Sequence, residues 1–327
     1  AAAHAAHAVG APAAEDGLSI AGANGGGGPG GVGRAAAVFV LDNTTAASIG
    51  DDAKVTAGGN LLVNAADFTD VDVLGIGAGI GIGAAGVGVG LGVSDIHKDT
   101  TAFIGDASVD AKGDSGTAMI VPDGSLSDTG VFGITTATDD VRGVVVLAET
   151  SEDVLSVAIA GAGGTGAGIA GSVTVTIIDS DTGAYIDDGA SVNVDSAGAN
   201  ANQDVYVSAV NNLKTLAISG ALGVGLGAGI AGGVDVGIMR NDTTAFVAGD
   251  VSAKRDVNVN SIANRDIDTY VRSAAGGTVG LGAAVAVYSI GGQFISEYSY
   301  EDGEETQDDN SLTGTDEDGN DSDTLSI

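Results

Sequence analysis

Paired carboxylates are the residues in this sequence that most resemble catalytic groups. They occur at Asp51-Asp52, at Asp139-Asp140 and at Asp187-Asp188. Two carboxyl groups that flank a bond can act as general acid and base, as in glycoside hydrolysis. Adjacent residues of a strand point to opposite faces, however, and aspartate is also typical of turns and of solubilising charge. We therefore interpret these pairs as turn residues and expect no enzymatic activity.

The histidines and one glycine motif give little support for a catalytic or cofactor site. His4 and His7 would need a helix to share a metal, and His97 stands near the end of an expected strand without a triad around it. Residues 161–166 match the GxGxxG pattern of dinucleotide-binding loops, but no helical periodicity follows them. We expect no organic cofactor.

An acidic segment near the end of the chain raises the question of calcium. Its oxygen-bearing side chains alternate around Gly319, and the candidate ligands are Asp316, Asp318, Asn320 and Asp323. The segment lacks the bidentate glutamate spacing of an EF-hand, and an acidic linker has the same composition. The sequence leaves both interpretations open.

Composition narrows the class of protein. Lys and Arg number 11 against 44 Asp and Glu, which gives a net charge of −33 and argues against binding to nucleic acid. The 327 residues include 56 Gly, no Trp and no Cys, and aromatic residues make up 4%. Such a chain has few large side chains for a core, no disulfides and no thiolate ligands, and its small and β-branched residues favour closely packed sheets.

Long stretches in which glycine alternates with aliphatic residues are the strongest structural signal. In residues 73–93 the glycines occupy odd positions up to Gly83 and even positions from Gly86, so the alternation changes phase at Ala84-Ala85. Alternation with a period of two places glycine on one face of a strand and Ile, Val or Leu on the other. The pattern predicts two strands joined by a turn, and it argues against a transmembrane helix, in which so many glycines would be unfavourable. Similar stretches occur at 158–178, 217–238 and 274–290.

A short polar-to-apolar phrase marks an internal repeat. Its copies begin at Asp42, Lys98, Ser180 and Asn241, about 60 residues apart once an insertion of about 25 residues in the second unit is removed. Threonine pairs are typical of the phrase, although Gly183 replaces the second threonine in the third copy. The residues that define it are Asn43, Thr44, Thr45, Asp99, Thr100, Thr101, Asp181, Thr182, Asp242, Thr243 and Thr244.

These patterns predict an all-β, elongated solenoid similar to a parallel β-helix, with about four repeats. Residues 1–34, rich in Ala and then Gly, are expected to form a flexible arm, and the acidic residues 301–327 a linker or tail. The repeat region spans 35–300. Its expected units are approximately 35–85, 86–170 with an inserted loop at 110–140, 171–231 and 232–300.

The phrase, followed by a Val-x-Val strand and a glycine-alternating strand, resembles the repeats of leukotoxin-type filamentous adhesins, which are similar in plan to filamentous haemagglutinin. The resemblance covers roughly residues 35–300 and implies a bacterial surface protein with a β-solenoid shaft. It supplies no catalytic residues. The departures in the second and third copies make a self-assembling filament subunit a serious alternative to a shaft.

The function expected from the sequence is that of a secreted structural or adhesive protein of the cell surface. Open strand edges are templates for pairing, so the expected partners are copies of the same chain, together with a host or neighbouring-cell surface. We expect neither nucleic-acid binding nor stable membrane insertion. The alternatives are a glycan-binding or glycan-cleaving β-helix, for which aromatic residues are scarce, and a membrane-inserting, toxin-like module that uses the glycine runs.

Overall fold

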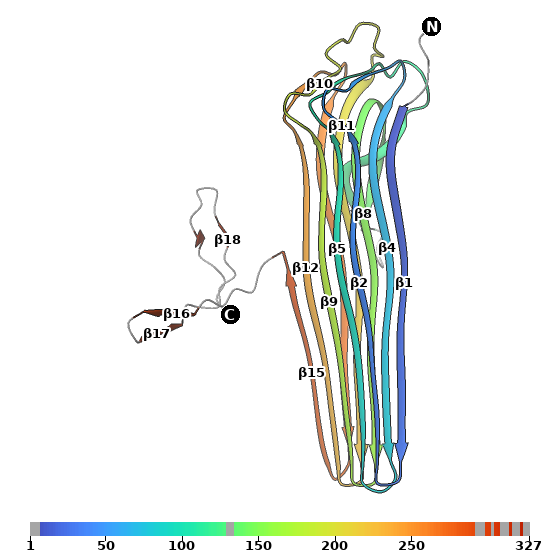
Figure 1. The fold of residues 1–327 in the computed structure, drawn as a ribbon, viewed down its shortest axis with the longest axis vertical. Coiled ribbons are helices and arrows are strands. Elements are labelled where there is room, and N and C mark those ends of the chain that lie inside the picture. The colour runs from blue at the N-terminus through green and yellow to red at the C-terminus, as the bar shows by residue number, and fades with distance from the viewer. Residues whose placement is uncertain are drawn as a thin grey trace.

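The chain folds into a solenoid made of parallel β-strands. The computed structural model describes residues 7–128, 134–291, 298–301, 304–307, 314–315 and 321–322. Two long sheets lie against each other, and each coil of the chain contributes one strand to each of them (Figure 1). The all-β, solenoid-like fold predicted from the sequence is therefore confirmed.

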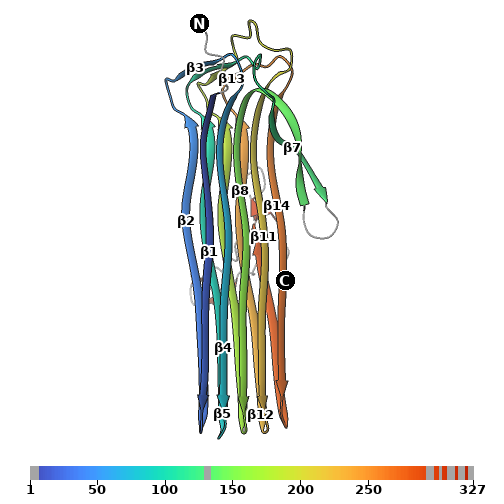
Figure 2. The same cartoon turned by 90° about the vertical axis from the view of Figure 1, so that its right-hand side faces the viewer.

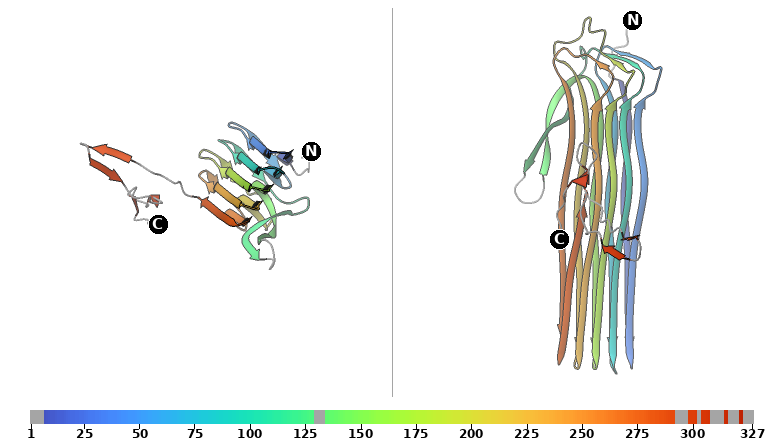
Figure 3. Two further views of the ribbon diagram at one scale, coloured as in Figure 1. Left: turned by 90° about the horizontal axis from the view of Figure 1, so that it is seen from below. Right: turned by 90° about the vertical axis from the view of Figure 1, so that its left-hand side faces the viewer.

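Each long sheet contains five parallel strands, one from each coil. Sheet A has the order β1 (His7–Gly27), β4 (Leu61–Gly81), β8 (Ile134–Gly164), β11 (Gln203–Gly225) and β14 (Val257–Gly276). Sheet B has the order β2 (Gly30–Ile49), β5 (Ala85–Ile104), β9 (Ala167–Ile186), β12 (Ala228–Val247) and β15 (Val279–Ile290). Seen from below, the coils stack as successive layers (Figure 3).

Shorter strands complete the coils and leave the main body. Sheet C joins β3 (Lys54–Ala57), β6 (Ser108–Ala111), β10 (Ser191–Val192) and β13 (Asp250–Val251) at the end of the molecule opposite the tight turns. An antiparallel arm is formed by β7 (Met119–Asp128) and the start of β8. It packs on the outer face of sheet A, where Val121 belongs to one buried cluster with Tyr206 and Ile262, and then leans away from the long strands (Figure 2). This arm occupies the site of the inserted loop expected at 110–140. Two short antiparallel pairs follow β15: β16 (Tyr298–Glu301) with β17 (Glu304–Gln307), and β18 (Gly314–Thr315) with β19 (Asp321–Ser322).

The side chains between the two long sheets become smaller towards the tight turns. Near sheet C the core contains Leu61, Ile104 and Ile186. Near the turns it consists of alanines such as Ala160 and Ala231, and then of glycines. We call the half next to sheet C the base and the half next to the turns the blade; the blade comprises residues 73–93 and the residues in register with them in the other coils.

Glycine lines the inside of the blade because the two backbones approach each other there. A Cβ added to Gly75, Gly77 or Gly79 would overlap a backbone carbonyl oxygen of β5. A Cβ on Gly171 or Gly232, which face outwards, would meet nothing within 4 Å. The predicted turn between β4 and β5 is present at residues 82–84, where the alternation changes phase.

The structure differs from the sequence-based expectation for residues 7–34. Instead of a flexible arm, these residues form β1 and the beginning of β2, so the described solenoid has five coils rather than about four. Glycine has a packing role here as well, because a Cβ on Gly25 would overlap the backbone of Val32. Pro12 lies in β1, an end strand, where the missing backbone N–H is tolerated.

The coils also begin and end at other residues than the expected repeats. Each coil starts with its strand of sheet A, so the boundaries fall near residues 61, 144, 203 and 257. The first phrase pairs one residue out of the expected alignment: Thr45, not Thr44, is opposite Thr100. The last described strand of the solenoid ends at Ile290, before the expected limit of 300.

Candidate association surfaces

The two ends of the solenoid expose strand edges. Strands β1 and β2 pair on one side with β4 and β5, and β14 and β15 pair on one side with β11 and β12. No described strand pairs with their other sides, although the β7 arm contacts β14 near Asn260. Each end therefore presents two long edges whose outward N–H and C=O groups lack a strand partner within the described part of the chain, which makes them templates for a further strand.

The end formed by β14 and β15 also leaves core positions uncovered. Val257 and Val259 are in register with Val205 and Val207 of the preceding coil. Val205 and Val207 are 0% exposed, whereas Val257 is 46% and Val259 42% exposed. Strand β15 ends at Ile290, opposite Met239, so it does not extend over this part of the core as β12 does in the coil before.

The repeat phrase places its residues alternately inside and outside sheet B. Its inward threonines form one row, in which Thr45, Thr100 and Thr182 are buried. The row of outward residues consists of Thr44, Asp99, Asp181 and Asp242. Asn43 points inwards, and Thr101 and Thr244 lie on the outer face in register with Gly183. Thr243 continues the inward row into the fourth coil. The phrase is therefore a structural element that brings like residues of successive coils together.

Three aromatic rings of the phrase stack on the outer face of sheet B. The ring centroids of Phe103 and Tyr185 are 5.0 Å apart, and those of Tyr185 and Phe246 are 4.9 Å apart, with interplanar angles of 9° and 2°. Both faces of the Tyr185 ring are thus covered, and burial raises the pKa of its hydroxyl. Phe246 ends the ladder and is 41% exposed. A further coil would continue this ladder on its free face.

A buried row of polar side chains crosses the interior between the base and the blade. The Lys98 Nζ lies 2.5 Å from Asp67 Oδ1 and 3.6 Å from Glu152 Oε1, and all three side chains are fully buried. Asn43 donates from Nδ2 to Asp67 Oδ2 over 2.8 Å and to Glu15 Oε1 over 2.9 Å. Burial raises the pKa of Glu152, and the charge of Lys98 opposes that rise.

The polar row continues through the later coils by hydrogen bonds. Ser180 Oγ donates to Glu152 Oε1 over 2.7 Å, and Asn211 Nδ2 donates to Ser180 Oγ over 3.1 Å. Asn241 Nδ2 then donates to Asn211 Oδ1 over 3.1 Å. These bonds join sheet A to sheet B at one level, and a register shift of one residue would break them. The sequence analysis did not identify Lys98 as a buried residue. Its position in the repeat phrase, in register with inward residues of the other coils, was the signal that could have shown it.

Acidic rows dominate the outer face of sheet B at the base. Asp99, Asp181 and Asp242 lie on neighbouring strands in register. Burial, followed by the charges of Asp242, Asp179 and Asp99, raises the pKa of Asp181. The described residues contain no group of three or more His, Cys, Asp or Glu side chains arranged to hold a metal ion. The candidate calcium ligands Asp316, Asp318, Asn320 and Asp323 lie outside the described residues.

Two of the three aspartate pairs lie at turns, as predicted, whereas Asp139 and Asp140 lie in β8, where they pair with β7. Asp51 Oδ1 accepts a hydrogen bond from the backbone N–H of Asp106 over 3.0 Å, and Asp187 Oδ1 accepts one from Asp188 over 2.9 Å. Asp52 has a positive φ of 59°. His97 lies on the outside of β5 with Nε2 3.7 Å from Asp95 Oδ1. These side chains do not converge on a common cleft.

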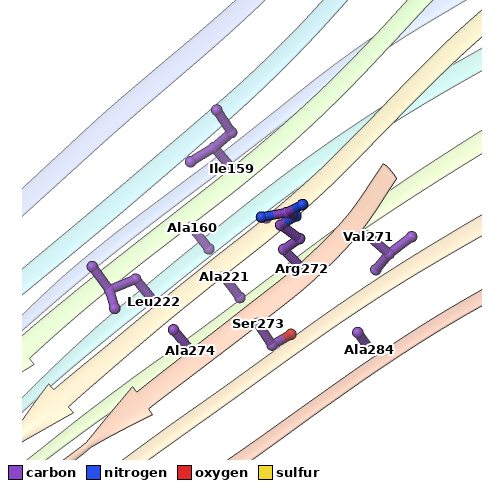
Figure 4. A pocket seen from close by; sticks show the side chains of 10 residues that line it. Ile159, Ala160, Ala221, Leu222, Val271, Arg272, Ser273, Ala274 and Ala284 are labelled. Atoms are coloured by element: carbon purple, nitrogen blue, oxygen red, sulfur yellow. The ribbon is translucent and has the colours of Figure 1, made fainter. Parts of the chain in front are cut away.

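A hollow in the blade has a mainly apolar lining. It has a volume of about 640 Å³ and is lined by residues of β8, β11, β14 and β15 (Figure 4). Its lining includes Ile159, Leu222 and Ala274, and the one charged lining residue is Arg272. Besides Arg272 the only polar side chain of this lining is that of Ser273, and without a carboxylate or a histidine the lining offers no acid–base pair.

No described helix is long and apolar enough to cross a membrane. Searches among protein-family models, curated proteins and solved structures find no match to this chain.

Proposed function

We propose that this chain is a structural, adhesive component of an extracellular or bacterial cell-surface fibre, in which copies join through the edges of their end strands. The observation that carries the proposal is the uncovered core at the end formed by β14 and β15. Val257 and Val259 occupy positions that the coils of β4, β8 and β11 bury, yet they are 46% and 42% exposed. Covering them with another coil would remove apolar surface from water, which is favourable.

Head-to-tail stacking continues the geometry within the molecule. All the strands of sheet A are parallel, as are all those of sheet B, so β1 and β2 of one copy can follow β14 and β15 of another. An interface between two different ends does not close on itself and therefore generates a filament. Thr45 of β2 lies in the same row as Thr100 and Thr182, so the inward threonine row would recur in the next copy.

Charge sets the conditions for this assembly. The chain has a net charge of −33, and the acidic rows of successive coils are aligned rather than staggered. Stacking brings further like charges into these rows, and salt screens their repulsion over about 10 Å or less. We expect filaments to lengthen as salt rises, as is appropriate for a protein of a saline medium. The adhesive role and the bacterial surface derive from the resemblance of the repeat phrase to filamentous adhesins.

The test compares the chain with a variant in which the end is charged. In Val257→Lys with Val259→Lys, the lysines remain hydrated in the monomer but would be buried in a stack. Val194→Lys is the matched control, because Val194 is 61% exposed and lies away from the ends. Negative-stain electron microscopy and sedimentation velocity should show filaments for the unmodified chain and the control, and single particles for the end variant. Equal association of all three proteins would refute edge stacking.

The adhesive part of the proposal needs its own measurement. Beads that display the chain should adhere to cells. Beads that display the same number of molecules of the end variant should adhere less, because the variant cannot stack into fibres that reach the cell surface. Glycan arrays and liposomes address the alternatives. Specific binding to one glycan class by the end variant as well as the unmodified chain would favour the glycan-binding alternative.

A further inference from the structure

The outer face of sheet B in the blade is an aliphatic surface without a partner in the described structure. Its residues alternate with inward ones, which are glycines, alanines and polar residues such as Ser172 and Thr174, so its side chains cannot be buried in the core between the sheets. We call it the valine face. It consists of the outward residues Val87, Val89, Leu91 and Val93 of β5, Ile169, Val173, Val175 and Ile177 of β9, Ile230, Val234, Val236 and Ile238 of β12, and Leu281, Val285 and Val287 of β15.

Charged residues bound this surface on its base side. Along the outward positions the first charged residue is Asp95 in β5, Asp179 in β9 and Arg240 in β12. The end strand β2 carries Arg34 on its outer side, in register with Val89 of the valine face. Besides Asp95, which is in register with Ile177 at the base limit, it is the one charged side chain among the described outward residues of sheet B that are in register with this face. The tight turns at the other limit, such as residues 82–84 and 165–166, carry no charge.

The valine face has the size at which an exposed apolar patch marks an interaction site. Its longest rows, 169–177 and 230–238, span nine residues, which at about 3.3 Å per residue give a length of about 30 Å. Four strands about 4.8 Å apart give a width of about 19 Å, hence about 570 Å². A contiguous apolar patch larger than a few hundred Å² is unusual on a monomer, and this area approaches the roughly 800 Å² that each partner contributes to an interface of standard size.

The relief of the face suits a second copy of itself. Gly171 and Gly232 leave open hollows in the surface, because nothing lies within 4 Å of an added Cβ. Ile169 and Ile230, two residues before them on the same strands, project and are each 41% exposed. A face that carries both projections and hollows can interdigitate with its own copy, as the inner faces of two packed sheets do.

Charge determines how the second copy must lie. If the two blades overlapped with their strands in the same direction, the acidic rows of both bases would face each other. If the strands run in opposite directions, the two bases lie at opposite ends and the overlap contains the aliphatic rows of both copies. A two-fold axis parallel to the stacking direction gives this arrangement and keeps each coil level with its counterpart. Two stacks can therefore grow in the same direction side by side.

We propose that the valine face binds the valine face of a second copy, with antiparallel strands, and so pairs two solenoids laterally. This association uses none of the end strands' free edges and can occur whether or not the chains stack end to end. A lipid bilayer is the less suitable occupant, because the unpaired backbone groups of β2 and β15 and the guanidinium of Arg34 would then lie in hydrocarbon.

The test uses the end variant Val257→Lys with Val259→Lys as background, so that stacking does not contribute. Ile169→Lys with Ile230→Lys places charge in the centre of the valine face. Ile159→Lys with Leu222→Lys is the matched control, because these side chains are 43% and 51% exposed on the outer face of sheet A. Sedimentation velocity in about 1 M NaCl should show a dimer for the background and the control. The valine-face variant should dimerise at least about 100-fold more weakly. Dimers that persist in this variant, or that disappear in the control instead, would overturn the proposal.

Cross-linking tests the orientation, and the chain has no native cysteine to interfere. Thr165→Cys lies at a tight turn, and Ile177→Cys lies near the base end of the valine face. A mixture of the two single-cysteine proteins should form the mixed disulfide, whereas Thr165→Cys alone should remain monomeric on reducing-agent-free gels. Efficient self-linking by Thr165→Cys would show a tip-to-tip arrangement and reject the antiparallel one. Flotation with phosphatidylcholine vesicles tests the lipid alternative. If the background protein floats with the vesicles and the variant Ile169→Lys with Ile230→Lys does not, the face binds lipid instead.

Discussion

Replacing Lys98 by methionine should strongly destabilise the folded chain. Lys98 Nζ is fully buried, 2.5 Å from Asp67 Oδ1 and 3.6 Å from Glu152 Oε1. Methionine fills a similar volume without strain, so the effect isolates the charge. The variant leaves two carboxylates inside a sheet sandwich from which water is excluded.

The magnitude follows from the burial of these groups. Removing one partner of a buried ion pair destabilises a protein by about 3–5 kcal/mol, because the remaining charge is uncompensated. Asp67 retains hydrogen bonds from Asn43 (2.8 Å) and Thr45 (3.0 Å), and Glu152 retains one from Ser180 (2.7 Å). These donors stabilise the carboxylates in part, so we expect the lower half of that range, about 3–4 kcal/mol near pH 7.

The pH dependence of this loss identifies its cause. Burial already raises the pKa of Glu152 above 4.5, and loss of the Lys98 charge raises that pKa further. A carboxyl group with a raised folded-state pKa favours the folded state below its unfolded pKa and loses that contribution as the pH rises through the folded pKa. The difference between Lys98→Met and the unmodified chain should therefore shrink when the pH falls from about 8 to about 5.

Urea unfolding followed by circular dichroism measures these free energies. Adding Asp67→Asn and Glu152→Gln to Lys98→Met removes the uncompensated charges and should restore most of the lost stability. Lys214→Met is the control, because Lys214 pairs with Asp153 on the surface, where both side chains are more than half exposed. A loss below about 1 kcal/mol for Lys98→Met, the same at both pH values, would refute the reasoning.

Three further outcomes are expected from the same unfolding assay. Gly77→Ala should lower stability by several kcal/mol, because its Cβ would overlap a carbonyl of β5. Gly171→Ala, with open space at its Cβ, should stabilise the chain by about 0.5–1 kcal/mol. Equal effects of the two substitutions would contradict the close approach of the sheets. Burial raises the pKa values of Glu149 and Glu152, so stability should increase as the pH falls from about 7 to about 5, and a monotonic decrease would argue against this burial. Stability should also rise with NaCl up to about 1 M, because the net charge of −33 is screened; a fall would show that charge repulsion is minor.

Much of the local structure follows from the sequence. Two-residue alternation of glycine with Ile, Val and Leu excludes a helix, and the change of phase at Ala84-Ala85 places the turn between β4 and β5 where the structure has it. The recurring phrase predicts coils with like residues in register. Open strand edges at the two ends were also predicted from the sequence, because a stack of parallel strands leaves an unpaired edge at each end.

The tertiary structure alone decided which residues complete the solenoid and what fills it. Residues 7–34 look like a flexible linker, because alternation with small side chains is a weak local signal, but β4 and β5 supply edges on which they form strands. The burial of Lys98 depends on contacts with Asp67 and Glu152, which are distant in sequence. The phrase by itself suggested an alignment of Thr44 with Thr100, whereas the pairing of β2 with β5 places Thr45 opposite Thr100.

The sequence by itself determined that the chain is an acidic, all-β repeat protein with glycine-faced strands, because composition and a period of two are local properties. The structure decided that the glycines of both sheets meet inside the blade and that the aliphatic residues are consequently displayed outside. Alternation along one strand defines two faces but carries no information about what lies opposite them. That information comes from the packing of one sheet on the other, which brings together residues that no local pattern connects.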